Sequence, residues 1–250
     1  MLQSAQFIGF SIRFQLKCIL LNLQDILYYL RPKMNNPYLI FDFDGTLVDS
    51  FSTVIEKFNL MADKFSFRKV EESEVASLRD FSSKELIRFL QIPLYKIPSV
   101  IFEARRQMRA SMQILSSFDG LPEALQLFHD KGFTLGVLTS NSSENVTEWL
   151  RRNNMEHLFH FIHVESSYFG KKQVLLKILK SYGIDKSQAY YVGDETRDIE
   201  AAKKCGVASV AVTWGFNSEK TLIQCQPDYI VRQPQEMVAI LVSQKKPILK

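Results

Sequence analysis

The sequence predicts an α/β protein with a doubly wound parallel sheet and an inserted all-helical segment. From residue 133 onward, short β-rich runs alternate with amphipathic segments, as in a parallel sheet covered by helices on both faces. An apolar run at residues 38–41 leads into two aspartates and a glycine, where a buried strand would end. Residues 51–117 have helical periodicity and no run typical of a buried parallel strand.

The individual elements follow from local signals. The apolar runs predict strands after the first one at residues 133–139, 159–164, 189–192, 207–212 and 228–231. Amphipathic segments predict helices near residues 144–153, 172–182, 197–204 and 234–242. Pro122 suits the first turn of a helix that Gly132 follows, and Gly183 and Gly206 suit the ends of later ones.

These patterns divide the chain into three parts. We expect an α/β core made of residues 34–50 and 118–250, and a helical cap at residues 51–117. Residues 1–33 are an N-terminal extension that is either an added helix or sequence upstream of a start at Met34. The extension has apolar patches, but charges interrupt them before they reach the roughly 18 residues that a membrane span needs.

Composition excludes several classes of partner. The net charge is +4, but residues 1–33 contribute four basic residues and one acidic residue, so the remainder is nearly neutral. We therefore expect no nucleic-acid partner and no membrane. Cys18, Cys205 and Cys225 are scattered and lack metal-ligand spacing, which favours a reduced, cytoplasmic protein.

Asp42 and Asp44 are the most informative residues. They lie two positions apart at the end of the first strand, so both side chains point to the same side. Two like charges placed together are unfavourable unless they share a cation or a proton. This pattern indicates a metal-assisted active site at the carboxyl edge of the sheet, where α/β folds bind ligands.

Four motifs follow one another at strand and helix ends. Residues 42–50 read Asp-Phe-Asp-Gly-Thr-Leu-Val-Asp-Ser, residues 138–141 read Leu-Thr-Ser-Asn, residues 170–171 are Gly-Lys, and residues 193–198 read Gly-Asp-Glu-Thr-Arg-Asp. With these motifs, the chain from about residue 37 to about residue 241 resembles the haloacid dehalogenase superfamily, in particular its phosphoglycolate phosphatase-like branch. That resemblance implies a Rossmann-like core and a helical cap.

The resemblance also implies roles for individual residues. Asp42 would be the nucleophile and Asp44 the general acid and base. A Mg²⁺ cofactor would be held by Asp42, the Asp44 backbone carbonyl and Asp194, with Asp198 in the same acidic cluster. The phosphoryl group would meet further side chains, namely Thr139, Ser140, Asn141 and Lys171.

Several of these positions also have a purely structural explanation. Asp194 and Asp198 could be a charge pair in the first turn of a helix, and residues 139–141 could cap the next helix. If the motif is aligned one residue further along the chain, Lys172 and not Lys171 is the motif lysine. In the cap, Arg79 is a candidate for a substrate anion, although surface charge is the better explanation for it.

The implied activity is a Mg²⁺-dependent phosphatase acting on a small phosphorylated metabolite, with a 2-phosphoglycolate-like ester favoured. The alternatives are a phosphomutase of the β-phosphoglucomutase type, a pyrophosphate or nucleotide phosphatase, and a non-catalytic binding protein. Cap closure would need hinges near residues 48–50 and 117–120. We expect that stiffening Gly120 with proline lowers turnover and has little effect on folding.

Overall fold

The computed structural model describes residues 36–165 and 170–243, so the expectations for residues 1–33 lie outside the described residues. The strands are β1 (Tyr38–Phe41), β2 (Thr134–Thr139), β3 (Phe159–Val164), β4 (Ala189–Gly193), β5 (Ala208–Val212) and β6 (Tyr229–Val231). The α-helices are α2 (Phe51–Phe65), α3 (Val75–Leu78), α4 (Ser83–Phe89), α5 (Ile97–Ser111), α6 (Leu121–Asp130), α7 (Ser143–Arg152), α8 (Lys171–Ser181), α9 (Thr196–Cys205), α10 (Glu219–Gln224) and α11 (Pro234–Ser243). Short 3₁₀ helices are η1 (Glu72–Glu74), η2 (Leu94–Lys96), η3 (Glu156–Leu158) and η4 (Lys186–Gln188).

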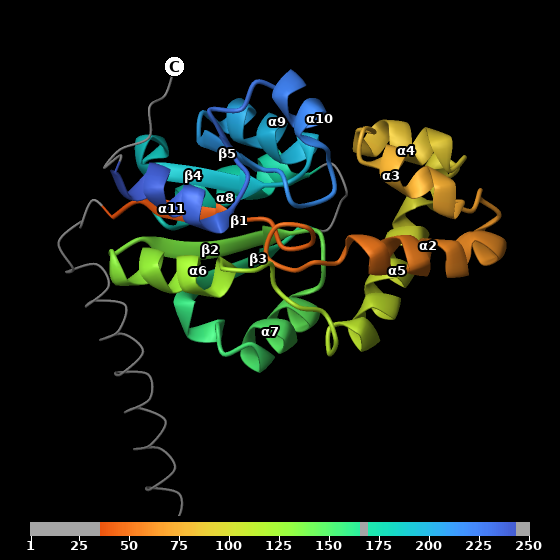
Figure 1. The fold of residues 1–250 in the computed structure, drawn as a ribbon, viewed down its shortest axis with the longest axis horizontal. Helices are drawn as coiled ribbons and strands as arrows, with labels where there is room; N and C mark the ends of the chain where they lie inside the picture. The colour runs from red at the N-terminus through yellow and green to blue at the C-terminus, as the bar shows by residue number, and fades with distance from the viewer. Residues whose placement is uncertain (1–35, 166–169, 244–250) are drawn as a thin grey trace, which may run out of the picture. The chain divides into compact units, whose positions relative to one another are not determined.

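The six strands form one parallel sheet in the order β3-β2-β1-β4-β5-β6 (Figure 1). This confirms the predicted fold class, and the predicted strand ends agree with the observed ones to within a residue. Because the chain runs outward from β1 in one direction and from β4 in the other, the crevice between β1 and β4 is the switch point of the sheet. Ligands of open α/β folds bind at the carboxyl ends of the strands at this point.

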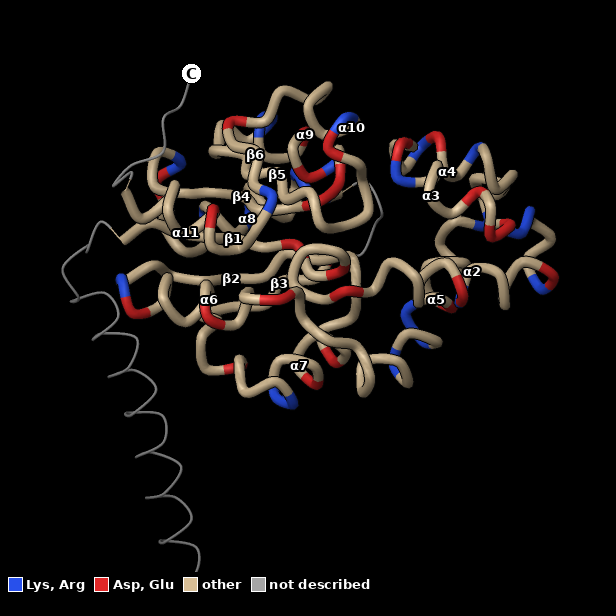
Figure 2. The backbone as a smooth tube through the Cα atoms, in the orientation of Figure 1, with Lys and Arg blue, Asp and Glu red and all other residues tan. Residues whose placement is uncertain are grey.

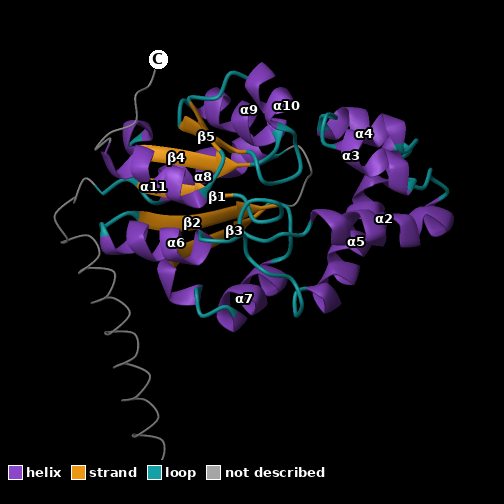
Figure 3. Ribbon diagram, in the orientation of Figure 1, coloured by secondary structure: helices purple, strands orange, loops and turns teal. Residues whose placement is uncertain are grey.

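Helices cover both faces of the sheet (Figure 3). In β1, Leu39 and Phe41 belong to one buried cluster and Ile40 belongs to the other. The first cluster includes side chains of α6, α7 and α11, such as Leu125 and Trp149, and the second includes side chains of α8 and α9. Burial on both faces explains why the strands read as continuous apolar runs.

The regular elements between β1 and α6 are all helical. This agrees with the helical periodicity of residues 51–117. Residues from α2, α3, α4 and α5 bury a separate apolar cluster, which includes Phe51, Met61, Phe67, Leu78, Leu90 and Val100. The cap therefore has an apolar core of its own, against which Phe216 of the loop after β5 also packs. The cap boundaries at residues 51 and 117 stay a prediction.

The two segments that connect cap and core run side by side. Val48 and Ser117 form an isolated antiparallel bridge, and the Asp49 amide donates to the Ser116 carbonyl at 3.0 Å. Gly120 precedes α6 with a φ of +75°. Proline requires a φ near −65°, so the expectation that Gly120→Pro has little effect on folding is wrong.

Of the described helices, none combines the length and the apolar character that crossing a membrane requires. Within the same residues, Cys205 and Cys225 are free thiols.

Candidate active site

The motif residues meet at one edge of the sheet because their strands are neighbours. Asp42 follows β1 and Asp194 follows β4, and these two strands pair directly, with Phe41 opposite Val192. Thr139 ends β2 on the other side of β1, and Lys171 is the first residue of α8, which comes after β3. Figure 2 shows acidic segments where β1 ends and near α9.

Lys171 is buried, with 3% of its side chain exposed, and it joins two carboxylates. Its Nζ donates to Asp42 Oδ2 and to Asp198 Oδ1, each at 2.5 Å. Burial alone would lower the pKa of Lys171, but Asp198 and Asp42 outweigh that effect and raise it. Lys172 is exposed, so the structure supports Lys171 rather than its neighbour as the lysine of this site.

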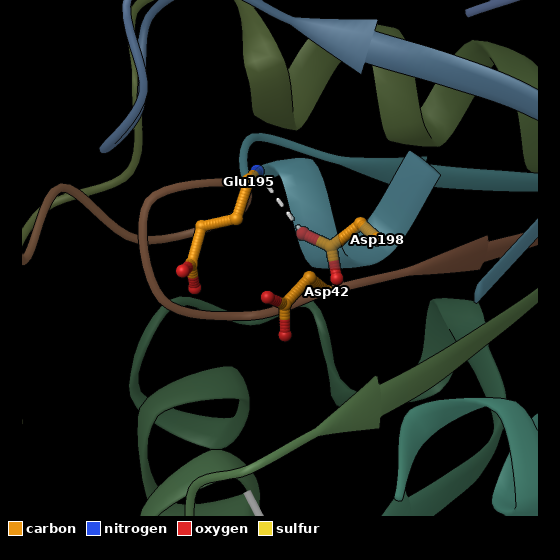
Figure 4. A group of neighbouring side chains, drawn as sticks. All are labelled: Asp42, Glu195 and Asp198. Atoms are coloured by element: carbon orange, nitrogen blue, oxygen red, sulfur yellow. Dashed lines mark hydrogen bonds between the residues drawn. The ribbon is translucent and has the colours of Figure 1, made fainter. Parts of the chain in front are cut away.

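Asp42, Glu195 and Asp198 form an acidic cluster in which one oxygen of each lies within 4.8 Å of the others (Figure 4). The Glu195 amide donates to Asp198 Oδ2 at 3.1 Å, so α9 begins inside the cluster. Burial raises the pKa of Asp198 to about 6, with Asp42 adding to the effect and Lys171 opposing it. Burial also raises the pKa of Asp42, again against Lys171.

Asp194 is fully buried beside this cluster. It accepts hydrogen bonds from Thr46 Oγ1 at 2.6 Å and from the Phe216 amide at 2.7 Å. Burial, followed by the charges of the neighbouring acids, raises the pKa of Asp194 well above its ordinary value. A Cβ on Gly45 would lie 2.2 Å from Asp194 Oδ2, and one on Gly215 would lie 2.3 Å from it, so both glycines leave room for this carboxylate.

Asp44 is held from one side by Asn141, whose Nδ2 donates to Asp44 Oδ2 at 2.9 Å. Asn145 donates to Asn141 Oδ1 at 2.8 Å, which fixes the orientation of the Asn141 amide. The other oxygen, Asp44 Oδ1, is buried and has no hydrogen-bond partner among the described residues. Burial raises the pKa of Asp44, and the bond from Asn141 opposes the rise. The Thr139 hydroxyl accepts a hydrogen bond from the backbone amide of Asn141 at 2.9 Å.

A cavity of about 160 Å³ opens between Asp44, Asn141 and their neighbours in the core on one side and the cap on the other. From the core it is lined by Asp44, Ser140, Asn141, Glu195, Arg197, Phe216 and Asn217. From the cap it is lined mainly by apolar side chains, among them Phe51, Val54, Phe58, Leu78, Phe81, Leu86, Ile101 and Met108, together with Ser83 and Arg105.

Arg79, the cap residue expected to meet substrate, is not among the residues that line this cavity. Its guanidinium donates to the Gly215 carbonyl and lies over the Phe51 ring, 4.2 Å from the ring centroid. Its backbone carbonyl accepts from the Ser218 amide at 2.7 Å. Arg79 therefore ties the cap to the loop after β5, and its contact with substrate stays a prediction.

Two residues of the site were missed by the sequence reasoning. Glu195 is part of motif four and accepts from Ser83 Oγ of the cap at 2.8 Å and from Arg197 at 2.6 Å. Its acidic neighbours in that motif were the signal that could have identified it. Arg105 of α5 donates to the Ser140 and Glu165 carbonyls. No sequence signal distinguishes it from the adjacent Arg106.

The donor set fits a hard divalent cation. Asp42, Glu195 and Asp198 bring three carboxylates together, paired with Lys171 and Arg197, and the charges of these three acids also act on the buried carboxylate of Asp194. Burial is the main cause of the raised pKa values of Asp42, Asp194 and Asp198, and the neighbouring carboxylates add to it. Oxygen-rich, negatively charged sites of this kind suit Mg²⁺.

Comparison with known proteins agrees with this architecture. The chain belongs to the haloacid dehalogenase-like hydrolase family, whose model matches residues 39–212. A phosphoglycolate phosphatase from Synechococcus elongatus is 34% identical over 200 residues, covering 80% of this chain and 94% of that protein. Pyrophosphatase PpaX from Listeria innocua is 22% identical, covering 81% of this chain and 95% of that protein.

Among solved structures, a predicted phosphatase from Clostridium acetobutylicum superimposes with a TM-score of 0.73 at 25% identity, covering 84% of this chain and 99% of that chain. Within its family the protein is a phosphatase.

Proposed function

We propose that the protein is a cytoplasmic, Mg²⁺-dependent phosphatase that hydrolyses a small phosphate monoester through an aspartyl-phosphate at Asp42. An ester resembling 2-phosphoglycolate is the favoured substrate. The observation that carries the proposal is the contact of buried Asp42 with Lys171, next to an acidic cluster and the partnerless Oδ1 of Asp44. A nucleophile, a cationic group for the phosphoryl oxygens and an acid are then within one site.

The proposed metal ligands are Asp42, the backbone carbonyl of Asp44 and Asp194, with Asp198 acting from the same acidic cluster. Glu195 belongs to this cluster as well. When bound, Mg²⁺ would neutralise the repulsion between these carboxylates and the phosphate. Lys171 keeps the Asp42 carboxylate oriented through its bond to Oδ2.

The phosphoryl group would be bound by the Thr139 hydroxyl, by Ser140 and Asn141, and by the Lys171 ammonium. Ser140 and Asn141 line the cavity, whereas Thr139 is not among its lining residues. The Thr139 hydroxyl accepts a hydrogen bond from the backbone amide of Asn141. Backbone amides before and at the start of α7 suit a phosphoryl oxygen, although those of Asn141, Ser142 and Asn145 donate to side-chain oxygens in this structure and would have to exchange these partners for the phosphoryl group.

In the first step, an oxygen of Asp42 attacks phosphorus and the bond from phosphorus to the ester oxygen breaks. Asp44 donates its proton to that departing oxygen, and its raised pKa suits this role. In the second step, Asp44 takes a proton from water, which attacks phosphorus, releases phosphate and regenerates Asp42. Asn141 holds Asp44 in place for both proton transfers.

The test is phosphate release from a panel containing 2-phosphoglycolate, pyrophosphate, sugar phosphates and nucleoside monophosphates, with Mg²⁺ and with chelator. We expect a chelator-sensitive preference for one small ester, and we expect the isosteric Asp42→Asn variant to be inactive while it remains folded. Preference for pyrophosphate or a nucleotide would replace the favoured substrate. No release from any ester by folded protein would refute a phosphatase acting on these classes, and substantial activity in Asp42→Asn would refute the assigned nucleophile.

A further inference from the structure

The cap wall of the cavity is apolar except at two places, Ser83 and Arg105. Ser83 donates its hydroxyl hydrogen to Glu195. Arg105 is therefore the one charged side chain that the cap contributes to the lining formed by the described residues. A charged substituent on a bound ester would be unfavourable against the rest of this wall.

Arg105 is fixed in position by the core. Its Nε donates to the Ser140 carbonyl, and its Nη2 donates to the Glu165 carbonyl at 2.8 Å. Its own backbone carbonyl accepts from Asn145 Nδ2 at 3.1 Å. These partners hold α5 against the ends of β2 and β3, so the position of the guanidinium is set before substrate binds.

The hydrogen-bond partners of the guanidinium are neutral carbonyls. Burial lowers the pKa of Arg105, and the carboxylates of Glu165 and Asp44 oppose that effect without bonding to the guanidinium. Among the described residues it forms no ion pair, in contrast to Arg197, which is paired with Glu195 at 2.6 Å. The two bonds use Nε and Nη2, whereas a guanidinium carries five N–H donors. A carboxylate is the planar acceptor that matches such a fork.

Arg105 lies close enough to Asp44 for the two charges to interact. Asp44 lines the same cavity, and in the proposed function Asp44 protonates the departing oxygen. The alcohol part of the ester must then lie between Asp44 and the cap. Asn145 connects the two residues, since it donates both to Asn141, which holds Asp44, and to the Arg105 carbonyl.

We propose that Arg105 binds an anionic carboxylate on the leaving group and so selects phosphate monoesters of small hydroxy acids over uncharged esters of the same size. This inference rests on the proposed function. It moves the anion-binding role in the cap from Arg79, which lies outside the cavity lining, to a residue 26 positions further along the chain.

The test compares kcat/KM for 2-phosphoglycolate with kcat/KM for ethyl phosphate, which has similar size and no carboxylate. Arg105→Gln keeps an amide donor for the core carbonyls and removes the charge, whereas Arg105→Lys keeps the charge. Arg109→Met is the matched control, because Arg109 is exposed one turn further along α5. Thermal unfolding of each variant reports whether the fold is intact.

We expect the wild type to prefer 2-phosphoglycolate by at least tenfold. Arg105→Gln should lower kcat/KM for 2-phosphoglycolate by about 10- to 100-fold, the usual effect of losing a charged hydrogen-bonded pair, and change ethyl phosphate by less than about threefold. Arg105→Lys should retain part of the preference, and Arg109→Met should retain all of it.

Each other outcome is decisive. Equal losses for both esters in Arg105→Gln would show that Arg105 only holds the cap, and the inference would fall. A wild type that hydrolyses both esters equally well would also overturn it, whether or not the variants fold, and would leave the phosphatase intact. A wild type that hydrolyses neither ester but releases phosphate from another member of the panel overturns the inference alone, whereas no release from any member overturns the proposed function as well.

Discussion

Replacing Lys171 with methionine removes the only positive charge that bonds to both Asp42 and Asp198 within the described residues. Both contacts are 2.5 Å long, and all three side chains are at most 3% exposed. Methionine fills a similar volume but donates no hydrogen bond. The variant therefore leaves two carboxylates facing each other in a site from which water is largely excluded.

The magnitude follows from these contacts. Removing one partner of a buried ion pair costs about 3–5 kcal/mol, and two charge-assisted hydrogen bonds at about 1.5–3 kcal/mol each give a similar range. We expect Lys171→Met to lower the free energy of unfolding by about 3–5 kcal/mol at pH 7. Turnover should fall by about 10²- to 10³-fold, as for loss of one group that stabilises transition-state charge.

The loss of stability in Lys171→Met should depend on pH, because the variant changes the pKa of a buried carboxyl. Lys171 has a raised pKa, so in the wild type it stays charged from pH 6 to pH 7. Asp198 has a pKa of about 6 with Lys171 present, and losing the lysine raises it further, so in the variant it binds a proton already above pH 6. A carboxyl whose pKa is higher in the folded state stabilises folding as the pH falls. The wild type itself gains about 0.4 kcal/mol from Asp198 between pH 7 and pH 6, and the variant gains up to about 1.4 kcal/mol, so the difference between their free energies of unfolding should narrow by up to about 1 kcal/mol from this carboxyl.

The assay is urea unfolding followed by circular dichroism at pH 6 and pH 7, in buffer with chelator. Lys172→Met is the control, because Lys172 is exposed next to Lys171 in the same helix, and its stability should change by less than about 0.5 kcal/mol. If Lys171→Met is as stable as the wild type, or if its loss in free energy of unfolding grows as the pH falls, Lys171 does not stabilise Asp42 and Asp198 as described. Equal effects of the two substitutions would refute the assignment of the buried lysine.

Three further predictions concern the same edge of the sheet. Asn141→Ala should lower kcat by about 10- to 100-fold with a smaller change in KM, because Asp44 loses the donor that holds it; an unchanged kcat in steady-state kinetics would exclude this role. Gly45→Ala should reduce stability by at least about 1–2 kcal/mol in urea unfolding and weaken the response to Mg²⁺, since Gly45 has a φ of +76° and its Cβ would meet Asp194; a stable variant with normal metal response would contradict this packing. Mg²⁺ at about 100 times its Kd should raise the free energy of unfolding by ~2.7 kcal/mol, measured as a thermal shift that chelator reverses, and Asp194→Asn should reduce that shift.

Much of the fold was predictable because its signals are local. Parallel strands buried on both faces produce short apolar runs, and the glycines at helix ends mark the boundaries between elements. The carboxyl ends of parallel strands share an edge, so the strand assignments predicted that the motif residues gather there. The pairing of Asp42 with Asp194 was implied by the family resemblance, because the strand order is not contained in the strand assignments. The sequence did not decide between Lys171 and Lys172. Adjacent residues of a helix point in different directions, so the exact position at which the helix begins determines which of the two is buried.

The contacts of Arg79 and Arg105 could not be predicted from the sequence for a related reason. A sequence pattern indicates which face of a helix is apolar, but it does not show which part of the core that face meets. Arg105 contacts carbonyls 35 and 60 residues away, and Arg79 contacts one 136 residues away. Contacts across a cap and a core depend on how two separately folded clusters pack, and no local signal encodes that packing.

The paired connections at Asp49 and Ser116 have a consequence for how this architecture can be altered. The chain leaves the sheet and returns to it at points joined by a single backbone hydrogen bond of 3.0 Å. Any insert whose two ends come equally close could be exchanged there without moving a strand. With the roles proposed for Arg105 and Asp42, substrate choice and reaction chemistry lie in separable stretches of sequence, and we expect that grafting a cap from a relative transfers the first while the second remains with the host.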